Sequence, residues 1–126
     1  MKKIFIFMIF SISLFAQNLY FEAFKDIRQA KVIQNSNPKK AKQLFIEAYS
    51  YLKQLSNKSI KDNKPSSNVF YLLGEMYLYG EGIDKNTKIG LDFLCASSQL
   101  GNVRAKNLLK KLNKTCKKIN FKELKQ

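Results

Sequence analysis

The chain has 126 residues, 23 of them Lys or Arg and 9 Asp or Glu, which gives a formal net charge of +14. This length suits one small domain, and the complete lack of His excludes a His-based catalytic triad and a His metal ligand. The positive charge can attract anionic glycans, lipid headgroups, nucleic acid or acidic proteins, although surface lysines are often only solvated.

The first sixteen residues have the pattern of an export signal. Two lysines at positions 2 and 3 precede an apolar run from Ile4 to Phe15, and Ala16 is a small residue after which a signal peptidase can cut. Cleavage after Ser13 is an alternative. The apolar run is too short for a spanning helix, which needs about 20 residues. We therefore expect removal of residues 1–16 and a periplasmic or secreted protein, with an uncleaved anchor as the alternative.

A first helical hairpin is predicted over residues 17–55. Apolar residues at helical spacing predict one helix from Leu19 to Ile33. Pro38 suits the first turn of a second helix, where its missing N–H costs nothing. The buried stripe of that helix is expected to be Ala41, Leu44, Phe45, Ala48, Leu52 and Leu55. The next stretch, 56–67, is rich in Ser, Lys and Asn, and it predicts a flexible surface loop.

Residues 68–101 have the clearest helix–loop–helix pattern. Apolar residues from Val69 to Tyr77 predict a third helix, in which Gly74 leaves space for a neighbouring helix to approach closely. Gly80 and Gly82 follow this helix and are expected to take positive φ, because the backbone must leave the helix there.

The last predicted elements are a fourth helix, a capping helix and a basic tail. Thr87 is expected to cap the fourth helix, which Gly101 closes. Residues 102–126 are expected to form the capping helix, from Asn102 to Leu112, and the tail. Three apolar residues of the tail are available to dock on the helices: Ile119, Phe121 and Leu124.

A family resemblance rests on residues within these helices and in the turns that follow them. They are Leu73-Gly74, Tyr77, Gly80-Glu81-Gly82-Ile83, Phe93-Leu94 and Gly101-Asn102. Their spacing resembles the Sel-one-like repeat, a bacterial relative of the tetratricopeptide repeat. The resemblance implies an all-α fold, namely a short right-handed α/α solenoid of about two and a half helical hairpins, used mostly as a binding scaffold. Gly90 departs from the Ala that the family favours, and a mid-helix Gly costs about 1 kcal/mol.

Internal comparison of the chain gives two registers. Val69 and Leu73 recur as Ala105 and Leu109, 36 residues later, which is within the range of helical repeats. The second register is 49 residues and superimposes Ala41, Leu44-Phe45 and Ala48 on Gly90, Phe93-Leu94 and Ser97. The second register is longer than the first because the stretch after the second helix, residues 56–67, is longer than the connection after the fourth helix.

The two cysteines, Cys95 and Cys116, are candidates for a disulfide if the chain is exported. If the helices on either side of Gly101 are antiparallel, the cysteines stand about 13 Å out of register. Because the Cα atoms of a disulfide lie about 4.4–6.8 Å apart, the chain must bend back after about Asn113 to form it. An intermolecular bridge and free thiols are the alternatives.

Tetratricopeptide-like geometry implies a concave surface lined by the inner helices. The candidate partner-binding residues on that surface are Asn68, Tyr71, Glu75, Leu78, Tyr79, Arg104, Asn107, Lys111 and Lys114. Tyr offers contact area with a hydrogen-bonding tip, and basic side chains attract carboxylates, so an acidic peptide is a suitable ligand. The alternative is that the tyrosines pack against neighbouring helices and the charges are only solvated.

Enzymatic chemistry is not expected, and neither is a cofactor or a metal. The S-x-x-K motif occurs at residues 36–39 and 50–53, which chance explains in a Lys-rich chain, and S-D-N and K-T-G do not occur. The resemblance adds one alternative, because a cysteine-rich exported branch of the family includes proteins labelled penicillin-binding or β-lactamase.

The sequence therefore predicts an exported, non-enzymatic scaffold for a protein or peptide partner. The principal alternative is a protein that binds anionic glycan or lipid of the cell envelope, an interaction that added salt would weaken. Nucleic acid is a poorer candidate, since no zinc-finger, RNA-recognition or helix-turn-helix signature accompanies the positive charge.

Overall fold

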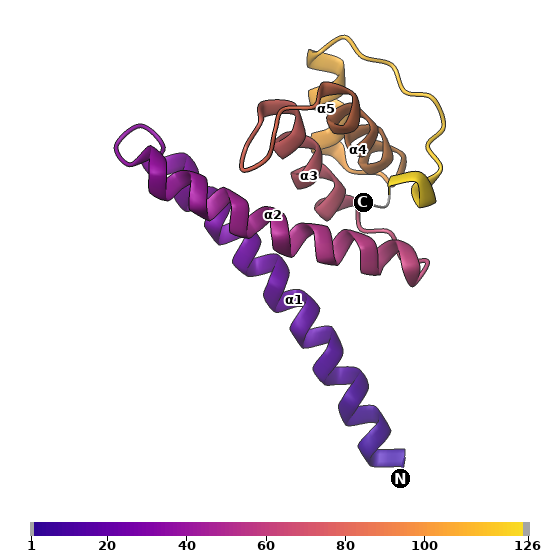
Figure 1. Cartoon of the computed structure of the whole chain (residues 1–126). Helices are drawn as coiled ribbons and strands as arrows, with labels where there is room; N and C mark the ends of the chain where they lie inside the picture. The colour runs from indigo at the N-terminus through magenta and orange to yellow at the C-terminus, as the bar shows by residue number, and fades with distance from the viewer. Residues whose placement is uncertain (1, 125–126) are drawn as a thin grey trace.

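The computed structural model describes the backbone of residues 2–124 and the side chains of residues 18–124. This part of the chain is helical and contains no strand, which confirms the predicted all-α class. Its elements, drawn in Figure 1, are α1 (Lys2–Ile33), α2 (Pro38–Lys61), α3 (Ser67–Tyr79), α4 (Thr87–Gln99), α5 (Val103–Lys111) and the short 3₁₀ helix η1 (Phe121–Leu124). Helices α1 and α2 form one packed hairpin, α3 and α4 form a second, and α5 lies against α4.

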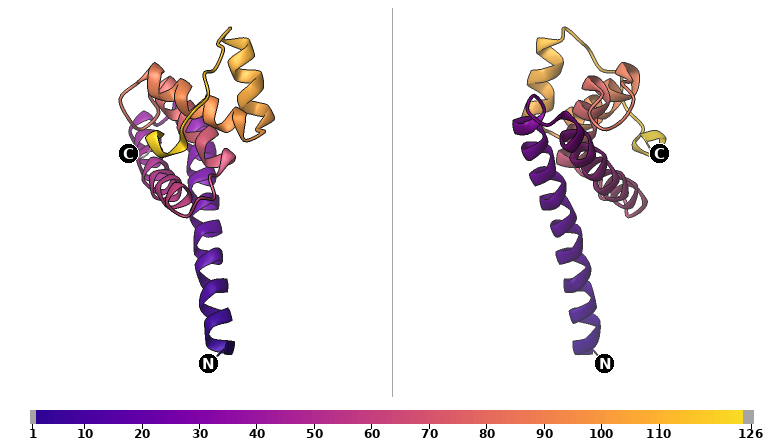
Figure 2. Two further views of the ribbon diagram at one scale, coloured as in Figure 1. Left: turned by 90° about the vertical axis from the view of Figure 1, so that its right-hand side faces the viewer. Right: turned by 60° about the vertical axis from the view of Figure 1, so that its left-hand side comes forward.

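Helix α1 begins at Lys2 and not at Leu19, where the first helix was predicted to begin. Residues 4–18 contain neither Gly nor Pro, so nothing in the sequence interrupts the helix there. The views in Figure 2 show α1 extending past the ends of the other helices. The predicted signal peptide, residues 1–16, lies outside the residues whose side chains are described. Among the described residues, no helix combines the length and the apolar character needed to cross a membrane.

Helix α2 begins as predicted and ends later than predicted. Pro38 lies in its first turn. The helix continues to Lys61, so the predicted loop over 56–67 is wrong in its first half. The reason is that Ser56 and Ile60 continue the buried stripe of the helix, although most residues around them are polar. Only residues 62–66 connect α2 to α3.

The helix caps occur at the spacings of the two internal registers. Ser66 caps α3 and Asn102 caps α5, 36 residues apart, and each side chain accepts a backbone N–H three residues on. Asn37 caps α2 and Asn86 caps α4 in the same way, 49 residues apart. The cap of α4 is therefore Asn86 and not Thr87, because the Asn86 Oδ1 accepts from the Ile89 N–H at 3.1 Å. Both registers thus describe equivalent local structures.

Helices α3 and α4 approach each other most closely at two glycines. A Cβ atom on Gly90 would lie 2.9 Å from the Leu78 nitrogen and 3.0 Å from the Gly74 carbonyl oxygen. A Cβ atom on Gly74 would lie 2.8 Å from Cγ of Leu94. The close approach predicted at Gly74 is confirmed. Gly90, which had only a helix-propensity cost in the sequence, is required by the same contact.

The turns that follow α3 and α4 use the expected glycines. Gly80, Gly82 and Gly101 have φ values of 69°, 76° and 93°, which L side chains rarely adopt. Gly80 is the left-handed C-cap of α3, and its N–H donates to the Met76 carbonyl. The positive φ predicted for Gly80 and Gly82 is confirmed, and Gly101 closes α4 as expected.

Cys95 and Cys116 form a disulfide with a Cα–Cα distance of 5.6 Å, which confirms the intramolecular pairing among the alternatives. The bridge is possible because α5 ends at Lys111 and Asn113 takes a φ of 54°, which turns the chain back where the geometry required it. Beyond the bridge, the Gln99 amide donates to the Lys117 carbonyl at 2.7 Å and accepts from the Ile119 N–H at 3.0 Å.

The tail docks on the main hydrophobic core. Phe121 stacks on Phe70 with a ring-centroid distance of 6.2 Å, and Leu124 is buried in the core that includes Leu52, Leu73 and Phe93. The views in Figure 2 show the tail returning from the end of α5 toward η1. The tail therefore covers one end of the core.

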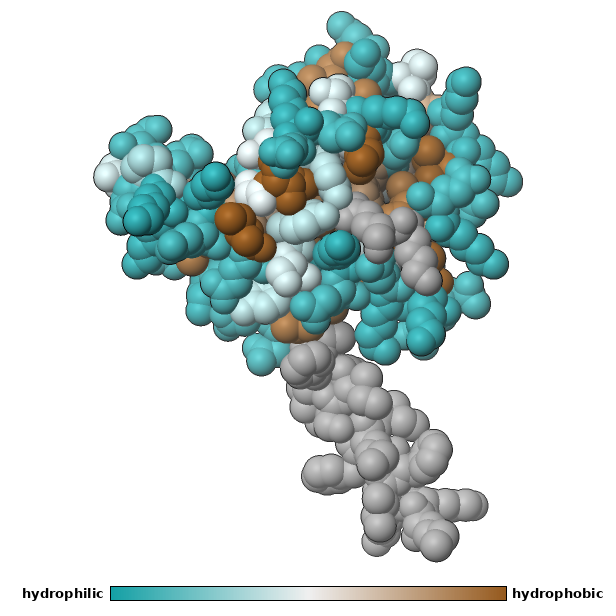
Figure 3. Space-filling view, in the orientation of Figure 1, coloured by the Kyte–Doolittle hydropathy of each residue, from teal (hydrophilic) through white to brown (hydrophobic). Residues whose placement is uncertain are grey.

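The face of the molecule drawn in Figure 3 is mostly hydrophilic, and its apolar residues lie in small groups.

Candidate functional site

The centre of the candidate site is the outward side of α3. Val69, Leu73 and Met76 are buried and hold this helix against its neighbours. The residues on another stripe, Tyr71, Glu75 and Tyr79, consequently remain at least partly accessible, and Tyr79 is 54% exposed. The sequence prediction that these three residues share one side of the helix agrees with this arrangement.

Leu78 does not belong to this surface, contrary to the prediction. Its exposed fraction is only 8%, and it packs in a cluster with Leu94, Ala105 and Leu109. The reason is that α4 and α5 cover the side of α3 on which Leu78 lies. Leu78 is therefore part of the packed interior between α3, α4 and α5.

Arg104 and Tyr71 join α5 to α3. The Cζ atom of the Arg104 guanidinium lies 4.5 Å from the centre of the Tyr71 ring, a cation–π geometry. The Tyr71 hydroxyl donates a hydrogen bond to the Glu75 carboxylate. Burial, this hydrogen bond and the Glu75 charge raise the pKa of Tyr71 to about 12, with Arg104 opposing the shift. Tyr71 therefore stays a neutral hydrogen-bond donor across the physiological pH range.

Two further charged residues, absent from the sequence prediction, complete the group. The Lys31 Nζ lies 3.9 Å from the Glu75 Oε2, which links the end of α1 to α3. Burial raises the pKa of Glu81, the Lys31 charge opposes that increase, and the Glu75 charge adds to it. Lys31 is distant from α3 in the sequence, so no local pattern indicates its ion pair with Glu75. We call Lys31, Tyr71, Glu75, Glu81 and Arg104 the Tyr71 cluster.

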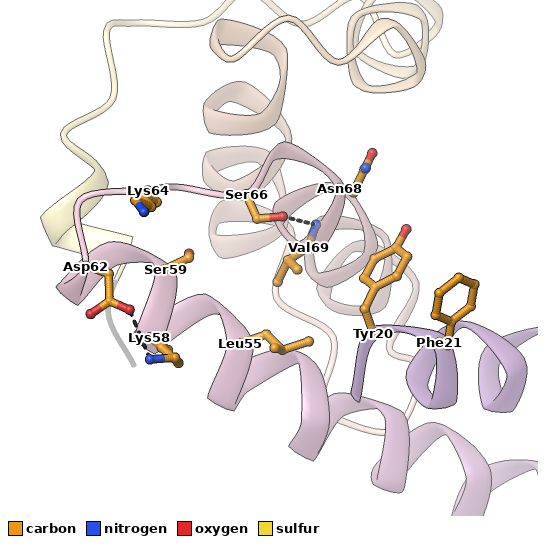
Figure 4. A pocket seen from close by; sticks show the side chains of 10 residues that line it. All are labelled: Tyr20, Phe21, Leu55, Lys58, Ser59, Asp62, Lys64, Ser66, Asn68 and Val69. Carbon is orange, nitrogen blue, oxygen red and sulfur yellow. Dashed lines mark hydrogen bonds and ion pairs between the residues drawn. The ribbon is translucent and has the colours of Figure 1, made fainter. Parts of the chain in front are cut away.

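An apolar hollow lies beside the start of α3 and has a volume of about 510 Å³. Its lining comes from α1, the end of α2, the connection after it and the start of α3, and consists of Tyr20, Phe21, Leu55, Lys58, Ser59, Asp62, Lys64, Ser66, Asn68 and Val69. Figure 4 shows Tyr20 and Phe21 projecting from α1 toward the side on which α3 begins. Phe21 is 67% exposed, and Lys58 forms an ion pair with Asp62 at 3.0 Å. The hollow thus has an apolar floor and a charged rim.

A second hollow, of about 440 Å³, lies at the other end of α3. Its lining residues come from the α1–α2 and α3–α4 connections and their flanks: Gln34, Pro38, Ala41, Lys42, Phe45, Tyr79, Gly80, Glu81, Gly82, Ile83 and Asp84. Asn68 of the first hollow and Tyr79 of the second lie on one stripe of α3, about 16 Å apart. Tyr71 and Glu75 lie between them, and an extended peptide of roughly five residues would span that length.

The predicted residues of α5 divide into two groups. Asn107 and Lys111 are exposed and follow Arg104 along one stripe of the helix. Lys114 does not continue this stripe, because α5 ends at Lys111 and the chain turns at Asn113. Lys114 instead lines a third hollow, beside Lys106 and Lys110. It is therefore not part of the surface around Tyr71.

Asn68 has a structural contact as well as its predicted surface position. Its Oδ1 accepts a hydrogen bond from the Asn102 amide at 3.1 Å, which ties the start of α3 to the cap of α5.

Comparison with protein-family models, curated proteins and solved structures found no match in any of the three. The function of the chain therefore has to follow from its own surface.

Proposed function

We propose that this protein is an exported, non-enzymatic scaffold of the Sel-one-like type, which binds a short acidic peptide segment of a partner protein along α3. The carrying observation is the Arg104 guanidinium stacked at 4.5 Å on the Tyr71 ring. A guanidinium held over a ring keeps its N–H edge available for a carboxylate, which it can bind through two parallel hydrogen bonds.

Arg104 has no carboxylate partner among the described residues. The ion pairs in that part of the chain are Lys25–Glu22, Lys31–Glu75 and Lys58–Asp62. Arg104 is itself exposed, so a peptide carboxylate can reach it without displacing an internal partner. Tyr71 and Tyr79 add aromatic contact area on the same helix, and such side chains are common anchors at protein interfaces.

Two observations support the export and scaffold parts of the proposal. The Cys95–Cys116 bridge is compatible with an oxidising compartment, where disulfides persist. The packed hairpins with caps at two internal spacings are compatible with a helical repeat. A signal peptide at residues 1–16 would deliver the chain to that compartment.

A peptide-display experiment tests the binding. The disulfide-bonded chain lacking residues 1–16 is panned against random heptapeptides, and enriched peptides are synthesised with and without Asp/Glu replaced by Asn/Gln. We expect acidic peptides to be enriched and to lose about ten-fold in affinity when neutralised, measured by fluorescence anisotropy. Enrichment without acidic residues would contradict the proposal.

Matched variants then locate the binding surface. Arg104→Ala is expected to weaken the selected acidic peptide about ten-fold, and Arg104→Lys by less, because Lys keeps the charge and loses the planar stack. Lys88→Ala, an exposed lysine in the first turn of α4, removes the same charge elsewhere and serves as the control. Far-UV circular dichroism checks that each variant stays folded. Equal weakening by Arg104→Ala and Lys88→Ala would show only a net-charge effect.

A further inference from the structure

A third hollow, beside the disulfide, is lined by three lysines. Its volume is about 540 Å³, and its lining residues are Ser98, Lys106, Leu109, Lys110, Asn113, Lys114, Thr115 and Cys116. None of these lining residues is acidic, and the ion pairs of the described residues include none of the three lysines. We call this hollow the lysine pocket.

The lysine pocket concentrates charge that its own fold does not neutralise. Lys106 and Lys110 are four residues apart on α5, where like charges destabilise a helix. Lys114 lies beyond the helix end, so its place beside them depends on the turn at Asn113. The net repulsion among the three would fall if an anion bound between them.

The disulfide holds the third lysine in place. Cys116, two residues after Lys114, is bonded to the buried Cys95 of α4. Immediately after it, Gln99 of α4 makes hydrogen bonds to the backbone of residues 117 and 119. Residues 113–116 are therefore fixed between the end of α5 and these anchors on α4.

The donors around the pocket fit a multiply charged oxyanion. The three ammonium groups are accompanied by the hydroxyls of Ser98 and Thr115 and the amide of Asn113, all of which can donate hydrogen bonds. A single carboxylate would leave most of this positive charge unbalanced, whereas a phosphate group has more charge and more acceptor oxygens. We propose that the lysine pocket binds a phosphate group of a ligand, and that the Cys95–Cys116 bridge keeps the pocket assembled.

This site goes beyond the acidic-peptide surface, because Lys106 and Lys110 lie on a different stripe of α5 from Arg104. The first test titrates inorganic pyrophosphate into the disulfide-bonded chain by isothermal calorimetry at physiological ionic strength. We expect saturable binding with one site per chain. Absence of saturable binding to the wild-type chain would overturn the proposal.

A pair of double variants separates the pocket from net charge. Lys106→Ala with Lys110→Ala is expected to weaken pyrophosphate about ten-fold. Lys39→Ala with Lys88→Ala removes the same charge from other exposed positions and should leave the affinity within about two-fold. Equal losses in the two double variants would overturn the proposal, since binding would then reflect only the total charge. All these positions are exposed, and circular dichroism checks the fold.

The role of the disulfide is tested on the wild-type chain, oxidised and reduced. Reduction should weaken pyrophosphate several-fold while helicity is retained, because Lys114 is no longer held near the other lysines. In the oxidised chain, Lys114→Ala should weaken binding about three-fold more than Lys39→Ala does. Equal effects of these two substitutions would contradict the part assigned to the bridge, even if reduction unfolded the protein.

The source of the phosphate is resolved by vesicles. Phosphatidylcholine vesicles with and without phosphatidic acid are sedimented with the wild-type chain and with the Lys106→Ala, Lys110→Ala variant. Wild-type sedimentation that requires phosphatidic acid and is lost in the variant would support a lipid phosphate. Pyrophosphate binding without any sedimentation would support a soluble ligand.

Discussion

The two helical hairpins bury their contact surfaces by different means. In the α1–α2 hairpin, long helices meet through small residues such as Ala23, Ala30 and Ala48, which are fully buried. In the α3–α4 hairpin, each helix has only 13 residues, and the helices meet at Gly74 and Gly90. The first hairpin thus depends on contact length, and the second on close backbone approach and the adjoining disulfide.

The two hairpins meet at Gly82, so substitution there has the largest expected effect. A Cβ atom would lie 2.6 Å from the Phe45 carbonyl carbon and 2.7 Å from its oxygen, and φ is 76°. Gly82→Ala should lower the free energy of unfolding by about 4 kcal/mol, because backbone strain and overpacking add together. Urea unfolding followed by circular dichroism measures the change.

Gly101→Ala is the matched control for that substitution. Gly101 also has positive φ, 93°, but no neighbouring atom lies within 4 Å of the position that a Cβ atom would occupy. We expect a loss of only about 1 kcal/mol, from backbone strain alone. If both substitutions lower the free energy of unfolding equally, the close contact between Gly82 and α2 does not contribute to stability.

Removal of the disulfide should affect the second hairpin more than the first. Cys95→Ala with Cys116→Ala opens a loop with a sequence separation of 21 residues, which corresponds to about 3 kcal/mol in the chain-entropy model. Hydrogen exchange should increase in α5 and the tail before it increases in α1 and α2. Simultaneous loss of protection in all helices would show that the hairpins unfold as one cooperative unit.

A smaller effect is expected at Asp26, a buried acid of the first hairpin. Its exposed fraction is 5%, and its Oδ2 has no hydrogen-bond partner among the described residues. Burial, followed by the charges of Glu47 and Glu22, raises its pKa, and Lys25 opposes the increase. Asp26→Asn should therefore increase the free energy of unfolding at neutral pH by about 1 kcal/mol.

The pH dependence of that difference follows from the direction of the shift. Below the ordinary aspartate pKa of 3.8, the carboxyl is protonated in both the folded and the unfolded chain, so wild type and Asp26→Asn should differ least. As the pH rises, the unfolded chain ionises first, and the wild type loses stability until the folded-state pKa is passed. Thermal unfolding from acidic to neutral pH measures this, and a constant difference would contradict it.

Local sequence signals predicted much of the fold because they act over a few residues. Pro38 in the first turn of α2 and positive φ at Gly80 and Gly82 follow from backbone stereochemistry. The two registers predicted equivalent positions, and the helix caps confirm their spacing. The loop predicted over 56–67 began too early in the sequence, because the Ser, Lys and Asn content of this stretch hid the helical position of Ile60, which is buried.

The candidate site was predictable only in part, because its residues come from separate elements. The stripe of Tyr71, Glu75 and Tyr79 follows from helical spacing alone. Leu78 was assigned to the surface and is buried, since the sequence does not show how far α4 and α5 cover α3. Lys31 was missed because its ion pair with Glu75 joins helices that are distant in the sequence.

The helical class, the turn glycines and the spacing of the two hairpins can be predicted from the amino-acid order alone, because periodicity and backbone preference are properties of short segments. Three other features depend on how the helices pack: the pairing of Cys95 with Cys116, the need for Gly at position 90, and the stacking of Arg104 on Tyr71. These contacts require a particular packing angle and separation of whole helices, which the burial of many side chains fixes together.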